Sequence, residues 1–130
     1  MLIKLTSIHV DDQDKALAFY TKKLGFVVKQ NFPAGAFKWI TVASAEEPDG
    51  TELLLEPNDN PAAQAYMKAL YDQSIAAASF AVEDVQAEYE RLTGLGVTFT
   101  MEPTDMGGTV IAMFDDTCGN LIQIHQVTGE

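Results

Sequence analysis

The chain has 130 residues, of which 47% are hydrophobic and 21% charged, a balance typical of one globular domain with a buried core. Nineteen acidic residues against eight basic ones give a formal net charge of −11. A surface of that sign repels phosphate groups, which argues against nucleic acid and anionic membranes as partners. The chain has one cysteine, Cys118, which excludes an intramolecular disulfide and suits a reduced compartment.

No basic segment followed by an apolar one occurs in residues 1–20, where a secretory signal peptide would have both. The longest apolar run, at residues 75–82, is far shorter than the ~20 residues that span a bilayer. We therefore expect a cytoplasmic protein with no membrane segment.

The first half of the chain is predicted to form a strand, a helix and three further strands. Hydrophobic spacing predicts a strand at 3–10 and a helix at 11–23, which Gly25 would end. Strands are expected at 26–30, 38–43 and 52–56, with turns at 33–35 and 48–50 where Pro and Gly cluster. A connecting segment follows at 58–73, with a helix at 62–71 that begins beside Pro61.

The second half repeats this order, with a strand at 75–82, a helix at 85–95, and strands at 98–100, 109–114 and 121–126. Two local motifs recur at nearly equal spacing: Val10-Asp11-Asp12 matches Val82-Glu83-Asp84, and Leu24-Gly25-Phe26 matches Leu95-Gly96-Val97. Such internal repetition indicates a duplicated βαβββ unit. We therefore predict an α+β fold with modules at 1–57 and 74–130.

These motifs resemble the vicinal oxygen chelate superfamily, which includes glyoxalase I, bleomycin resistance proteins and extradiol dioxygenases. Two further segments carry the resemblance: Ala18-Phe19-Tyr20 and the closing turn Asp116-Thr117-Cys118-Gly119-Asn120. In that turn Thr117 and Cys118 replace the Pro and Asp of the family's Asp-Pro-Asp-Gly-Asn. The resemblance implies one domain over 1–130, in which tandem βαβββ modules form a cup of curved sheets with the helices outside. It also implies a homodimer.

Alternation along each strand divides its side chains between the helix side and the cup side. The residues expected to bind a small molecule in the cup are Ser7, His9, Phe37, Trp39, Leu54, Ser79, Gln123 and His125. Phe37 and Trp39 share a face, so they either form an aromatic wall of the cup or pack in the core.

The metal enzymes of the family hold a divalent ion at four cup positions, which the resemblance transfers to Leu5, Glu56, Ala77 and Gln123. Leu5 and Ala77 have no donor atom, so we expect no metal and no other cofactor. The alternative is a shifted zinc, nickel or iron site made by His9, Glu56, Gln123 and His125.

The sequence therefore predicts a glyoxalase/bleomycin-resistance-like protein that binds a small molecule without the family's metal. The alternative is a lyase or isomerase, similar to lactoylglutathione lyase, or an enzyme related to the dioxygenases, in which Glu56 acts as a base. Three leucines precede Glu56, and such apolar surroundings favour proton transfer by a carboxylate.

Overall fold

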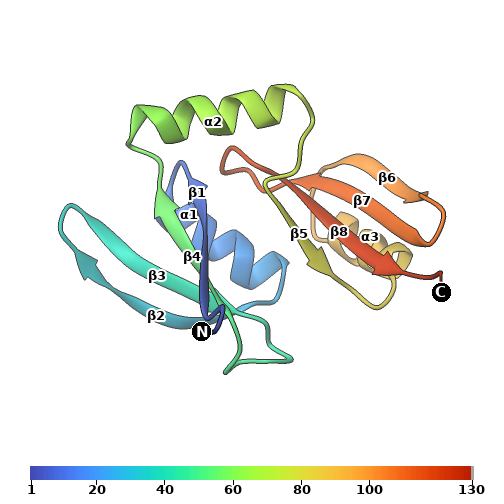
Figure 1. Cartoon of the computed structure of the whole chain (residues 1–130), viewed down its shortest axis with the longest axis horizontal. Coiled ribbons are helices and arrows are strands. Elements are labelled where there is room, and N and C mark those ends of the chain that lie inside the picture. Colours follow the sequence, from blue (N-terminus) through green and yellow to red (C-terminus); the bar gives the residue numbers. More distant parts are fainter. Residues whose placement is uncertain (130) are drawn as a thin grey trace. The chain divides into compact units, whose positions relative to one another are not determined.

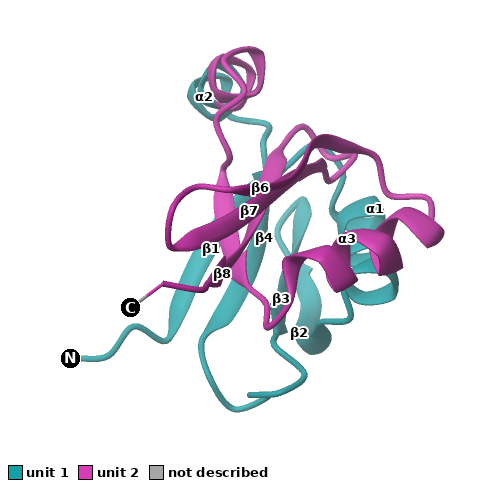
Figure 2. Cartoon of the chain, turned by 90° about the vertical axis from the view of Figure 1, so that its right-hand side faces the viewer, with its two compact units in different colours: residues 1–66 teal, residues 67–130 magenta. Residues whose placement is uncertain are grey.

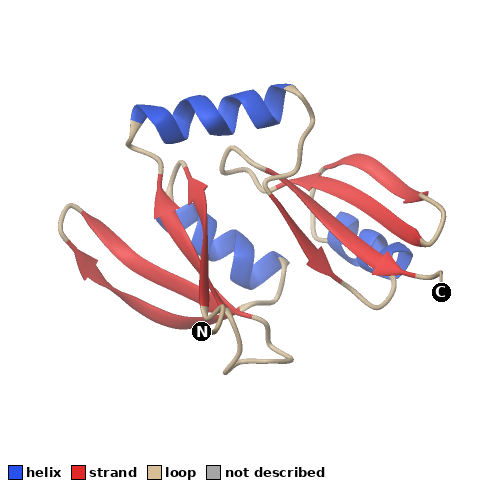
Figure 3. Cartoon of the chain, in the orientation of Figure 1, coloured by secondary structure: helices blue, strands red, loops and turns tan. Residues whose placement is uncertain are grey.

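The computed structural model describes residues 1–129. Over these residues the chain has the expected α+β architecture, with two four-stranded sheets and helices (Figures 1 and 3). The chain divides into two compact units, Met1–Tyr66 and Met67–Glu130, which Figure 2 distinguishes by colour. No helix in the described residues is long and apolar enough to cross a membrane.

The sheet of the first unit has the strand order β1-β4-β3-β2. Strand β1 (Leu5–Val10) pairs in parallel with β4 (Glu52–Pro57), and β3 (Phe37–Ala43) runs antiparallel to both β4 and β2 (Val27–Ala34). Helix α1 (Gln13–Ala18) continues as the π-helical segment η1 (Phe19–Lys23). The core between this helix and the sheet includes Ile8, Val10, Tyr20, Ile40 and Leu55.

The sheet of the second unit has the equivalent order β5-β8-β7-β6. Strand β5 (Ala78–Ala81) pairs in parallel with β8 (Leu121–Val127), and β7 (Thr109–Asp115) runs antiparallel to both β8 and β6 (Phe99–Asp105). Helix α3 (Val85–Gly94) packs on one face of this sheet. Its core residues include Val85, Leu92, Phe114, Ile122 and Ile124.

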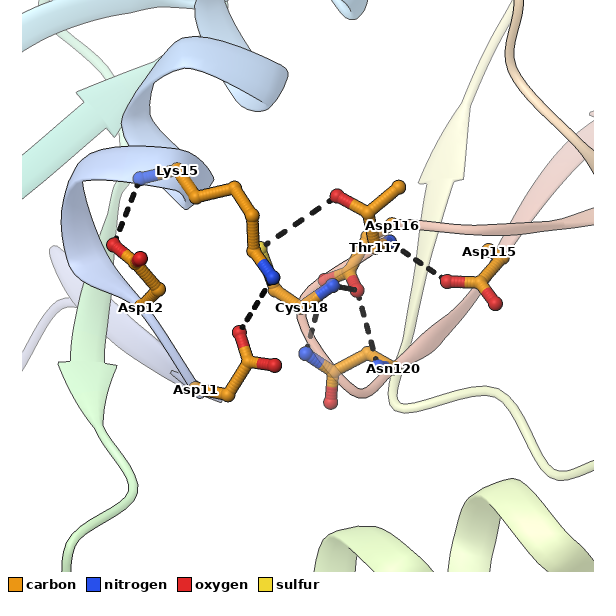
Figure 4. Close-up of polar contacts among 8 residues, drawn as sticks. All are labelled: Asp11, Asp12, Lys15, Asp115, Asp116, Thr117, Cys118 and Asn120. Carbon is orange, nitrogen blue, oxygen red and sulfur yellow. Dashed lines mark hydrogen bonds and ion pairs between the residues drawn. The ribbon is translucent and has the colours of Figure 1, made fainter.

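The repeated sequence motifs mark the two ends of each module's helix. Asp12 accepts a hydrogen bond from the backbone N–H of Lys15 at 3.0 Å (Figure 4), and Asp84 accepts the equivalent bond from Ala87 at 3.1 Å. Each aspartate therefore satisfies an N–H group that the first helical turn leaves unpaired. Gly25 and Gly96 follow the helices with φ values of +88° and +89°, which glycine adopts without steric strain.

The structure corrects several predicted boundaries. Pro33 and Ala34 were expected in a turn, but they lie in β2, and the chain turns at residues 35–36 instead. Proline is tolerated there because β2 is at the edge of its sheet. Strand β6 continues to Asp105 instead of ending at residue 100, whereas β5 is shorter than the predicted strand at 75–82.

Helix α2 (Pro61–Asp72) follows β4 and contains the division between the two units. In the second unit, the Tyr71 hydroxyl donates a hydrogen bond to Asp115. This contact raises the pKa of Tyr71 above its ordinary value, because the hydrogen bond and the nearby negative charge both favour the protonated phenol.

Candidate functional site

Each sheet has one side that faces away from the helix of its own unit, and we call this side the open face. In the first unit the strand registers and alternation place a mixed set of residues on the open face: Ser7, His9, Phe32, Phe37, Trp39, Thr41, Glu52, Leu54 and Glu56. All six sequence-predicted positions of this half are among them. Ser7 is exposed and Leu54 is buried on that face.

His9 and Glu56 are direct neighbours on the parallel strands β1 and β4. His9 Nε2 lies 3.1 Å from Glu56 Oε2, and their side chains are 36% and 38% exposed. A pair this exposed contributes at most about 1 kcal/mol to stability, because water screens it. The pair is therefore better suited to contact a ligand, or to move a proton, than to hold the fold together.

The open face of the first unit carries three aromatic side chains on neighbouring strands. Alternation along β3 places Phe37 and Trp39 on this face, whereas the buried Ile40 and Val42 are on the face beside α1. Phe32 pairs with Trp39 across β2 and β3, so it shares their face. Phe32 and Phe37 are 50% and 41% exposed. Phe32 was missed because the sequence pattern ended its strand at residue 30.

Glu52 lies on the same open face but is held by its neighbours. Its Oε1 accepts hydrogen bonds from the hydroxyl of Thr41 at 2.6 Å and from the side-chain amide of Gln30 at 3.1 Å. Thr41 is fully buried, so the first of these bonds satisfies a polar group that has lost contact with water. Glu52 is thus tied to the sheet, and Glu56 is the more available carboxylate.

In the second unit, three sequence-predicted residues form one cluster on the open face. Ser79 is the direct neighbour of Gln123 across β5 and β8, and His125 is two residues further along β8. Gln123 Nε2 donates to Ser79 Oγ at 2.9 Å, and Ser79 Oγ lies 2.7 Å from His125 Nδ1. We call these three residues the Gln123–Ser79–His125 cluster.

The closing turn has a structural role (Figure 4). The carboxylate of Asp116, which is fully buried, accepts hydrogen bonds from the backbone N–H groups of Cys118 at 2.7 Å and Asn120 at 3.0 Å. It also accepts from the Asn120 side-chain amide at 2.9 Å. The bond from Cys118 uses its backbone N–H group and does not depend on the side chain. A cysteine can therefore stand where the family has Asp, and this hydrogen bond is kept.

The residues at the family's metal positions do not fit a divalent ion. The side chains of Leu5 and Ala77 have no donor atom. The strand registers pair Leu5 with Glu52 rather than Glu56, and Ser79 rather than Ala77 with Gln123. The Gln123 amide already donates to Ser79. The shifted set consists of His9 with Glu56 in one unit and Gln123 with His125 in the other. Nowhere in residues 1–129 do three or more His, Cys, Asp or Glu side chains gather in a metal-binding arrangement.

Comparison with known proteins gives matches along nearly the whole chain. The model of the Glyoxalase/Bleomycin resistance protein/Dioxygenase superfamily matches residues 2–124. YurT of Bacillus subtilis (strain 168) is 59% identical over 126 residues, with 97% of this chain and 99% of YurT covered. A probable lactoylglutathione lyase of Synechocystis sp. is 28% identical over 136 residues, with 100% and 98% covered.

Solved structures of similar fold include UcmS2 and TnmS3. UcmS2 has a TM-score of 0.83 and 33% sequence identity, with 96% of this chain and 97% of UcmS2 covered. TnmS3, an antibiotic binding protein from Streptomyces sp. CB03234, has a TM-score of 0.75 and 27% identity, with 98% and 97% covered.

Proposed function

Since the chain belongs to the glyoxalase/bleomycin resistance protein/dioxygenase superfamily, we propose that it binds a planar aromatic small molecule and needs no divalent metal to do so. The observation that carries the proposal is the aromatic group of Phe32, Phe37 and Trp39 on the open face of the first unit. The antibiotic-binding function of TnmS3 supports it by similarity.

Covering the exposed aromatic side chains would supply substantial binding free energy. Phe32 and Phe37 are about half exposed, at 50% and 41%. Aromatic side chains offer roughly 150–250 Å² each, so covering the exposed parts of these two contributes roughly 3–6 kcal/mol at ~25 cal/mol per Å². Stacking on a ligand ring adds about 0.5–1.5 kcal/mol per aromatic pair.

The charge of the protein favours a cationic or neutral ligand over an anionic one. The formal net charge is −11, and Glu56 contributes a half-exposed carboxylate to the same open face. Such a field raises the local concentration of cations and repels anions. We therefore expect affinity to fall in the order cation, neutral compound, anion for ligands of the same shape.

Trp39 is the only tryptophan, so its fluorescence reports directly on this open face. The protein is titrated with three tricyclic compounds: proflavine (a cation), acridone (neutral) and 9-anthracenecarboxylate (an anion). We expect saturable quenching in that order of affinity, weakened at least tenfold by Phe37→Ala. Tyr66→Ala, which removes an exposed aromatic residue of α2, is the matched control and should bind normally. Absence of saturable binding by all three compounds would refute the proposal.

The metal-free part of the proposal has a separate test. Calorimetric titration of the purified protein with Zn(II), Ni(II) and Fe(II) should show no site tighter than ~100 µM, which is about −5.5 kcal/mol. Binding of one ion per chain, lost in Glu56→Gln, would contradict it.

The proposal also includes a cytoplasmic homodimer, which the family resemblance favours. Sedimentation equilibrium should give about twice the chain mass of 14.2 kDa. A mass equal to one chain at micromolar concentration would exclude the dimer.

A second candidate is a lyase or isomerase that uses Glu56 as a base. The contact between His9 and Glu56 favours it, because a partner within hydrogen-bond distance can orient a carboxylate or pass on its proton. Similarity to the probable lactoylglutathione lyase also supports it. The test is turnover of the hemithioacetal of methylglyoxal and glutathione, which Glu56→Gln should abolish. No turnover by the wild-type protein would count against this candidate.

A further inference from the structure

We infer that the Gln123–Ser79–His125 cluster fixes the proton of the neutral His125 imidazole on Nε2, and that this N–H group selects ligands with a carbonyl-type acceptor. The tautomer is a property of the protein alone. The selection of the ligand rests on the proposed function.

The direction of the hydrogen bonds follows from the number of donors in the cluster. Gln123 Nε2 donates to Ser79 Oγ at 2.9 Å, so the serine oxygen accepts on that side. The single hydroxyl hydrogen of Ser79 is then available for His125 Nδ1, which lies 2.7 Å away. If Nδ1 donated instead, Ser79 Oγ would accept from both neighbours and its hydroxyl hydrogen would have no acceptor among the described residues. We therefore assign Nδ1 as the acceptor, and a neutral imidazole whose Nδ1 accepts carries its proton on Nε2.

The surroundings of His125 leave that N–H group without a partner on the sheet. The cross-strand neighbours of His125 are Ala81 on β5 and Ile111 on β7, and neither side chain has a polar atom. Among the described residues, Ser79 is the one hydrogen-bond partner of the imidazole ring. A donor that a ligand covers must find an acceptor, since a buried and unsatisfied donor costs about 1–3 kcal/mol.

The chemistry of an uncharged donor defines the ligand group. A ketone, quinone or amide oxygen accepts a hydrogen bond without bringing a charge. A carboxylate would also accept, but the net charge of −11 disfavours it. We therefore expect the open face of the second unit to favour a neutral carbonyl oxygen as its ligand group.

The tautomer is tested without any ligand, by nitrogen NMR of histidine-labelled protein at pH 9, where ordinary histidine is neutral. In the wild type, His125 should show a protonated Nε2 and an unprotonated, hydrogen-bonded Nδ1, with His125→Gln providing the assignment. In Gln123→Glu the new carboxylate can only accept, so the Ser79 hydroxyl turns toward it. His125 should then carry its proton on Nδ1, which reverses the tautomer.

Gln126→Glu is the matched control because it places the same charge change on the same strand. The side-chain oxygen of Gln126 accepts from the backbone N–H of Val85, a role that a carboxylate can keep. The His125 tautomer should therefore be unchanged. A wild-type ring protonated on Nδ1, or a Gln123→Glu protein with the wild-type tautomer, would overturn the inference. Both variants are first checked for native amide spectra.

Selection is tested with 9-fluorenone and fluorene, which share a planar frame and differ by one carbonyl group. The wild type should bind 9-fluorenone about tenfold more tightly, with a shift of the His125 Nε2 signal. The preference should fall below twofold in Gln123→Glu and remain in Gln126→Glu. Equal binding to the wild type would refute the selection. If neither compound binds, the selection fails together with the proposed function, and the NMR result still decides the tautomer.

Discussion

Replacing Asp116 with alanine should destabilise the second unit by about 4 kcal/mol. The buried carboxylate accepts hydrogen bonds from the N–H groups of Cys118 and Asn120 and from the Asn120 amide. Bonds to a charged acceptor contribute about 1.5–3 kcal/mol each, and their losses overlap because they form one network. Asn120 is itself buried, so part of the cost is a polar group left without its partner.

The assay is urea denaturation followed by far-ultraviolet circular dichroism, which reports secondary structure in both units. Asp116→Asn should lose about half as much as Asp116→Ala. Its remaining oxygen can keep the two backbone bonds that Oδ1 accepts, but its N–H₂ group then faces the side-chain amide of Asn120. The charge-matched control is Asp49→Ala, whose fully exposed side chain makes only a long ion pair with Lys29. It should change stability by less than about 0.5 kcal/mol. A loss below about 1 kcal/mol in Asp116→Ala would refute the assigned role of the turn.

Three further predictions follow from the local geometry. Gly96→Ala should lower the free energy of unfolding by about 1–2 kcal/mol, because alanine is strained at the φ of +89° that Gly96 adopts. The loss comes from the backbone alone, since a Cβ atom there would contact nothing within 4 Å. An unchanged stability in urea denaturation would contradict this strain. Asp12→Ala should cost about 1 kcal/mol through the lost helix cap, and Asp12→Asn should recover most of it. NMR titration should place the pKa of Tyr71 above 10, and Asp115→Asn should lower it. The hydrogen bond from Tyr71 to Asp115 therefore stabilises the folded state fully below the pKa that Tyr71 has in the unfolded chain. This stabilisation disappears as the pH rises through the pKa of Tyr71 in the folded protein. Titration of Tyr71 at or below the ordinary tyrosine value would contradict the contact.

The duplicated fold was predictable because its signals are local. An aspartate that caps a helix and a glycine that ends it lie within a few residues of the backbone groups that need them. Asp12 and Gly25 therefore identify the first helix, and Asp84 and Gly96 the second. The π-helical segment at Phe19–Lys23 has no such signal, since its wider hydrogen bonds are not encoded in a residue pattern.

The candidate site was only partly predictable, because alternation assigns faces but not partners. It correctly placed Trp39 on the same face as Phe37, and His125 on the same face as Gln123. It could not show that Ser79 contacts His125, since that bond depends on the register between strands 46 residues apart in the chain. Phe32 was not predicted as a site residue for another reason. The turn signal at Pro33 was stronger than the strand signal before it, so the predicted strand ended at residue 30.

The position of Pro33 in β2 also affects how the protein behaves at high concentration. Residues Ala34 and Phe37 close the two-residue turn of the hairpin, so the next pair, Pro33 with Lys38, is one that exchanges no ladder hydrogen bonds. The nitrogen of Pro33 therefore points outward, where another chain's strand would seek a donor. The β2 edge is exposed and includes Val28 and Phe32, which would otherwise favour cross-β association. Pro33 thus interrupts the surface on which aggregates would grow, while the aromatic side chains beside it remain available to a ligand.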